Sequence, residues 1–166
     1  MFIDTHAHVN FHDFKDDAEE VIRRSLDNDT WMVLVGSEYK TSNRALNYAN
    51  RYQKGVYAAV GLHPIHLEEQ ALENNDENGD YSFTTRAEEF NYDAYEKLAK
   101  FEKVVAIGEI GLDYYHLDPT KNVSEAKRRQ QEVFLKQLVL ARNLDLPVII
   151  HCRQAHDDLL SILQDF

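Results

Sequence analysis

The chain has 166 residues, enough for one domain with a substantial hydrophobic core. Its 29 acidic and 18 basic residues give a formal net charge of −11, which argues against a protein that binds nucleic acid through a broad basic surface. With a single cysteine, Cys152, no internal disulfide can form, and no apolar run has the length of a signal peptide or a membrane span, so we expect a cytoplasmic protein outside the membrane.

Apolar strands alternate with helical patterns along the whole chain. The predicted strands are Phe2–Ala7, Trp31–Val35, Val56–Val60, Val104–Gly108 and Val148–Ile150. The predicted helices are Ala18–Leu26, one capped by Ser42, Tyr92–Phe101, a long one that begins at Ser124, and His156–Asp165. The alternation predicts an α/β fold with a parallel sheet, and polar residues follow the carboxyl ends of the strands, as at the active rim of a TIM (β/α)₈ barrel. We therefore expect a partial TIM barrel of about five βα units, with residues 1–166 forming a single domain.

One segment interrupts this alternation. Residues from about 68 to 91 form a polar insertion after the third strand, and Glu68 to Asp93 carries nine acids against one base, Arg86. We expect a mobile surface excursion there rather than a linker between domains. The rest of the chain is then close to neutral, which leaves room for a local phosphate site.

Three strands end in residues that ligate metals. His6 and His8 are two positions apart and so share one face of an extended strand, where two imidazoles can hold one ion. Glu109 and His151 follow two further strands, and the two oxygens of a carboxylate can bridge two cations. The alternatives are polar residues at a strand end for the histidine pair, a salt bridge for Glu109 and a buried core histidine for His151. Their recurrence at one predicted rim favours a shared metal centre.

Three more residues are candidates for substrate contact. Arg153 shares a face with His151 and suits bidentate binding of phosphate. His63, before Pro64, could contact substrate or donate a proton, or could simply be a turn residue. Asp113 could orient a ligand or the substrate. Two metals bridged by a carboxylate suit in-line displacement at a phosphodiester, because they supply hydroxide at neutral pH and neutralise charge.

Together these segments resemble the TatD family of metal-dependent DNases, in the amidohydrolase-like barrel superfamily. The resemblance is carried by Phe2–His8, Gly61–Pro64, Ala106–Tyr114, Gln130–Phe134 and Leu146–Arg153. It implies a divalent-metal hydrolase of DNA, often from the 3′ end, with a DNA substrate bound locally at the metals. In that family His6 and His8 would hold one metal, Glu109 would bridge as the central catalytic ligand, and His151 would hold the second. His63, which we also expect to be catalytic, and Arg153 would lie near the scissile phosphate. Apart from the resemblance, we expect Asp113 to be a substrate-side residue.

The resemblance also implies two divalent ions in a complete protein, which could be Zn, Mn, Co or Mg. The family uses a further histidine and a late aspartate that this chain does not reach, so we expect it to be incomplete for catalysis, and to self-associate or pair with a C-terminal part. Two alternatives remain open. One is an amidohydrolase-type enzyme for a small amide, ester or lactone, and the other is a non-catalytic metal-binding remnant.

Overall fold

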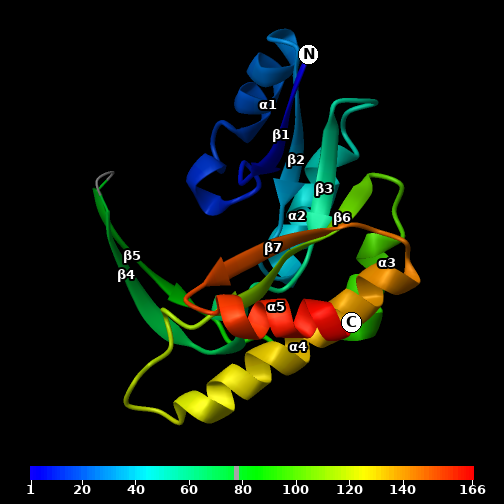
Figure 1. Ribbon diagram of the computed structural model, residues 1–166. Coiled ribbons are helices and arrows are strands. Elements are labelled where there is room, and N and C mark those ends of the chain that lie inside the picture. The colour runs from blue at the N-terminus through cyan, green and yellow to red at the C-terminus, as the bar shows by residue number, and fades with distance from the viewer. Residues whose placement is uncertain (77–78) are drawn as a thin grey trace.

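Five parallel strands form one curved sheet, the half-barrel expected from the sequence. The computed structural model describes residues 1–76 and 79–166. The sheet has the order β1 (Phe2–Ala7), β2 (Thr30–Val35), β3 (Val56–Val60), β6 (Val104–Asp113) and β7 (Val148–Arg153), all in parallel register (Figure 1). Among the described residues, β1 and β7 each lack a neighbouring strand on one side. The α/β class and the partial-barrel architecture are thereby confirmed.

The helices pack on the sheet and bury its apolar residues. They are α1 (Ala18–Asp27), α2 (Tyr39–Ala49), α3 (Tyr92–Ala99), α4 (Val123–Asn143) and α5 (His156–Asp165), with short 3₁₀ turns at His12–Phe14 and Pro64–Leu67. α2 packs on β2 and β3, and α4 packs on β6. Within the described part of the chain, no helix combines the length and apolar character needed to cross a membrane.

Residues of β2 show how the two faces of the sheet differ. Met32 and Leu34 belong to the large core that includes the helices, whereas Val33 and Val35 belong to a small cluster with Ala59 and Ala106 on the other face. This alternation is what a strand with both faces covered requires. Ile107 of β6 also packs in the helix-facing core.

Several element boundaries differ from those predicted. α2 is capped by Glu38 and Thr41 rather than by Ser42, whose hydroxyl bonds both backbone groups of Gly61. α4 is capped by Asn122, two residues before the predicted Ser124. β6 and β7 extend beyond their predicted ends to Asp113 and Arg153, because the polar residues there still pair through their backbone groups. Glu109 and His151 therefore lie within strands rather than after them.

The acidic insertion contains a β-hairpin, which the sequence analysis did not predict. Strands β4 (Gln70–Asp76) and β5 (Gly79–Thr85) pair antiparallel, with Leu72 opposite Phe83. The charge of the segment hid the strand-forming residues Tyr81, Phe83 and Thr84. The hairpin projects from the sheet as a separate two-stranded ribbon (Figure 1).

Candidate metal centre

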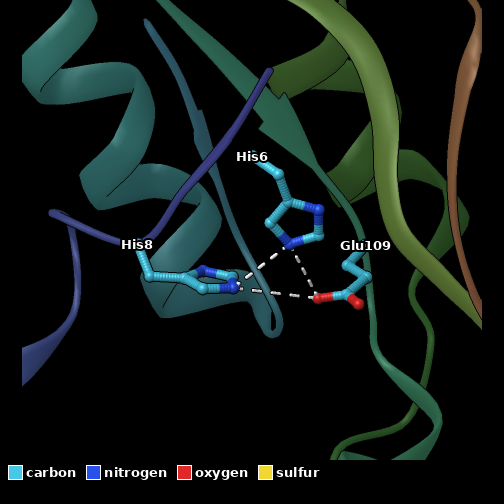
Figure 2. Close-up of side chains that lie close together, drawn as sticks. All are labelled: His6, His8 and Glu109. Atoms are coloured by element: carbon cyan, nitrogen blue, oxygen red, sulfur yellow. Dashed lines mark hydrogen bonds and ion pairs between the residues drawn. The ribbon is translucent and has the colours of Figure 1, made fainter. Parts of the chain in front are cut away.

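His6 and His8 converge on one oxygen of Glu109. The Nε2 atoms of the two histidines are 3.2 Å apart, and they lie 3.3 Å and 3.9 Å from Oε2 of Glu109. Figure 2 shows the three side chains pointing toward one another. β1 supplies the histidines and β6 the carboxylate, so segments about 100 residues apart in the chain meet at one point.

Hydrogen bonds prepare this first group for a cation. His8 Nδ1 donates to the carbonyl oxygen of Val35 at 3.1 Å, which leaves the lone pair of Nε2 facing Glu109. Burial lowers the pKa of His8, which favours the neutral ligand form. Neutral imidazoles and a carboxylate within ligand distance of one another fit a divalent ion.

The other oxygen of Glu109 faces a second pair of histidines. His151 Nδ1 lies 3.3 Å from Oε1, and His63 Nε2 lies 3.9 Å from the same oxygen. Each oxygen of this carboxylate thus has its own histidine pair, the arrangement that a bridging ligand requires. Burial opposes ionisation of Glu109, but hydrogen bonding to His151 and the nearby histidine charges lower its pKa to about 2.

The tautomer of His63 differs from the one that metal ligation requires. His63 Nδ1 accepts the backbone N–H of Ile65 at 3.2 Å, so the proton of the neutral ring belongs on Nε2. Burial, together with the charge of His151, lowers the pKa of His63 to about 3. His63 therefore presents an N–H donor to the centre, which suits contact with a substrate oxygen better than metal ligation.

His151 is held by a buried aspartate. Its Nε2 donates to Oδ2 of Asp113 at 3.0 Å, which leaves Nδ1 free to face Glu109. His116 Nδ1 donates to the same Asp113 oxygen at 2.8 Å. Burial acts to lower the pKa of His151, but its bonds to the carboxylates of Asp113 and Glu109 outweigh burial and raise the pKa to about 9. Burial acts to raise the pKa of Asp113, but its bonds with His151 and His116 hold that pKa well below its usual range. The Asp113 side chain is only 1% exposed, which favours a positioning role over the substrate contact that we expected.

Two glutamines of α4 fix the backbone on either side of the centre. Gln137 accepts from the N–H of Leu62 at 2.8 Å and donates to its carbonyl at 2.9 Å. Gln130 forms the same pair of bonds with Asp113, both at 2.8 Å. Seven residues separate the glutamines, so they lie on one helix face. α4 thereby positions both the residue before His63 and the aspartate that holds His151.

The remaining sequence-predicted residue, Arg153, is the last residue of β7, two positions beyond His151. Its guanidinium carbon is 3.8 Å from the centre of the Tyr115 ring. Tyr115 and His116 were not predicted to have a role. The signal for His116 was its position three residues after Asp113, at the turn that ends β6, but it could be recognised only with the turn geometry known.

The chain is similar in sequence to a family of metal-dependent hydrolases. A model of TatD related DNases matches residues 3–166. Two relatives are named uncharacterized metal-dependent hydrolases. YabD of Bacillus subtilis is 36% identical over 99% of this chain and 56% of its own, and YjjV of Escherichia coli is 38% identical over 95% of this chain and 53% of its own. A 3′-5′ ssDNA/RNA exonuclease TatD of Pantoea ananatis is 33% identical over 91% of this chain and 50% of its own.

A solved structure agrees with these sequence relatives. The crystal structure of YjjV, a TatD homologue from Escherichia coli, matches with a TM-score of 0.71 and 33% identity, over 99% of this chain and 55% of that one. The chain spans about half the length of the curated relatives it matches. Since the family match covers almost every residue and includes the strands that carry His6, His8, Glu109 and His151, the chain belongs to the TatD related DNase family of metal-dependent hydrolases.

Proposed function

We propose that this chain contributes the metal centre of a divalent-metal-dependent hydrolase that cleaves phosphodiester bonds in nucleic acid. The observation that carries the proposal is the sharing of Glu109, each of whose oxygens faces its own pair of histidines. The name of the Pantoea ananatis relative supports a single-stranded DNA or RNA substrate that is degraded from its 3′ end.

Each residue has a role in this proposal. His6, His8 and Glu109 would hold one ion, and Glu109 with His151 would hold a second. Bound divalent ions supply hydroxide at neutral pH and neutralise charge on the phosphate. Zn, Mn, Co and Mg all suit a mixed set of imidazole and carboxylate ligands to different degrees.

Two residues contact the substrate. His63 donates from Nε2 to a phosphate oxygen, and Arg153 binds the phosphate through its guanidinium. Contact is local because the net charge of −11 provides no general attraction for a polyanion. Asp113 keeps the imidazole of His151 turned toward the centre.

The test follows the shortening of a 5′-labelled single-stranded oligonucleotide in the presence of Mn²⁺, Zn²⁺ or Mg²⁺. We expect loss of nucleotides from the 3′ end, with a rate at least about 100-fold lower in Glu109→Gln, because a bridging ligand matters at least as much as an outer hydrogen-bond partner. The control is Glu102→Gln, which changes an exposed carboxylate outside the centre. Each reaction is run alone and with the C-terminal half of Escherichia coli YjjV added, since the chain spans half of that relative.

Two results would contradict the proposal. Cleavage that persists unchanged in Glu109→Gln would remove the bridging carboxylate from the chemistry. Turnover of an uncharged ester or lactone without any cleavage of oligonucleotides, alone or with the added half, would favour the small-substrate amidohydrolase.

A further inference from the structure

An exposed aromatic ring and an arginine form a pair at the edge of the metal centre. Tyr115 lies just after β6 and is 52% exposed, although it is a large aromatic residue. The guanidinium of Arg153 lies over its ring at 3.8 Å from the centroid, well within the range of a cation–π contact. This pair is not part of the ligand set around Glu109.

The backbone fixes the two side chains beside each other. Asp113 of β6 pairs in register with Arg153 of β7, and the N–H of Tyr114 donates to the carbonyl of Arg153 at 2.9 Å. The His116 ring stands edge-on to Tyr115 at 4.9 Å between centroids and is itself bonded to Asp113. Tyr115 is thus held from two sides, which reduces the entropy lost when a ligand stacks on it.

The pair also lies a short distance along the strands from residues of the metal centre. Arg153 is two residues beyond His151 along β7, a rise of about 7 Å in an extended strand. Tyr115 is likewise two residues beyond Asp113, the partner of His151. A nucleotide whose phosphate lies at the metal centre would therefore have its sugar and base in reach of Tyr115 and Arg153.

We propose that Tyr115 and Arg153 form a nucleotide subsite, in which the tyrosine ring stacks on an unpaired nucleobase and the guanidinium binds the adjoining phosphate. The inference rests on the proposed function and names the part of the substrate that this rim recognises. An aromatic face accepts any base, because every base has a π-face, so the subsite reads the presence of a base and not its identity. In a duplex the base faces are stacked on their neighbours, so the subsite selects single-stranded ends.

The experiment measures binding rather than cleavage. Two 5′-labelled single-stranded oligonucleotides with phosphorothioate linkages, which resist hydrolysis with Mg²⁺, are compared by fluorescence anisotropy in Mg²⁺. They differ only in whether the 3′-terminal nucleotides carry bases or are abasic. We expect the intact strand to bind at least about fivefold more tightly than the abasic strand, the lower end of what stacking on one aromatic ring supplies.

Variants assign this preference to the pair. Tyr115→Ala should remove the preference for the intact strand, and Tyr115→Phe should keep it because the ring is retained. Arg153→Ala should weaken both strands equally. The matched control is Phe101→Ala, since Phe101 is 51% exposed but lies between α3 and β6 at the opposite end of the strands, and it should keep the preference.

The outcomes separate this inference from the proposed function. Cleavage of ordinary oligonucleotides combined with an unchanged base preference in Tyr115→Ala, or with no preference in the native chain, would overturn the subsite alone. If the chain, with or without the added half of YjjV, neither binds nor cleaves any oligonucleotide, the proposed function falls and the subsite falls with it.

Discussion

Glu109 is the residue that both histidine groups share, so its substitution should weaken metal binding at both groups, whereas substitution of a histidine should weaken it at one. The first group offers three metal ligands, His6, His8 and Glu109. In the second group His63 presents an N–H and not a lone pair, so an ion there would have only Glu109 and His151 as ligands. We expect one tightly held divalent ion per chain after dialysis, measured by elemental analysis. His8→Ala and Glu109→Gln should both lose it, and His151→Ala should keep it.

Two results would count against this assignment of ligands. Retention of the ion by His8→Ala would show that it is bound elsewhere. Two ions held equally tightly would show that His63 acts as a ligand in spite of the N–H of Ile65 on its Nδ1.

Asp113 acts through the histidine that it holds. In Asp113→Asn the side chain loses its charge and one of its two acceptor oxygens, so the bonds that Oδ2 accepts from the rings of His151 and His116 and the bond that Oδ1 accepts from the N–H of His116 cannot all be kept. We expect the second, weaker ion to bind about 10- to 100-fold less tightly, while the tight ion is unaffected. Competition titration with a metal indicator measures both affinities, and Asp16→Asn, an exposed change far along the chain, is the control. Equal weakening of both ions would mean that the variant disturbs the whole centre.

At the scale of elements, α4 contributes more than apolar packing. Gln137 is 1% exposed and satisfies both backbone groups of Leu62. Gln137→Met preserves the size of the side chain but leaves those two groups without partners. We expect a loss of about 2 kcal/mol or more in the free energy of unfolding, measured by urea denaturation. Lys136→Met, on the exposed face of the same helix, should change it little, and an equal loss there would point to a general effect on the helix.

The sequence predicted the strands and helices well because their apolar residues recur with the right periods. It also identified His6, His8, Glu109 and His151, which the structure brings around one point, since the ends of parallel strands meet at one rim. The hairpin was missed because its residues are mostly polar and lack the continuous apolar runs by which the other strands were predicted. The bonds of Gln130 and Gln137 were missed for a related reason: they depend on which backbone groups remain unpaired after the sheet has formed.

At the scale of the whole molecule, the described part of the sheet has two open edges. Phe2 and Ile3 of β1 are 75% and 53% exposed, and Ile150 of β7 is 37% exposed. Unpaired strands with exposed apolar side chains favour association. We expect the purified chain to sediment as an oligomer or aggregate, and Ile3→Lys to shift it toward monomer. Lys100→Ile makes the opposite substitution at an exposed position of the helical layer, away from the two strand edges, and should not affect the monomer fraction.

A well-behaved native monomer with a sharp cooperative melt would contradict this expectation and show that five strands are sufficient. Association that Ile3→Lys leaves unchanged would place the contact away from β1. Addition of the C-terminal half of YjjV should compete with self-association if both use the same edges.

The base of the hairpin is closed by the body of the protein. Glu88 donates its N–H to the carbonyl of His66 at 2.8 Å, and its carboxylate accepts from the hydroxyl of Tyr95 at 2.7 Å. Leu67 and Thr85 are buried at this base, but the cost of closing a loop grows only with the logarithm of its length, so the length of the segment between Gln70 and Thr85 can change with little effect on stability. The hairpin is therefore a suitable attachment point for a fluorophore or a cross-linker. A probe there could report the approach of a substrate without a change to any residue of the metal centre.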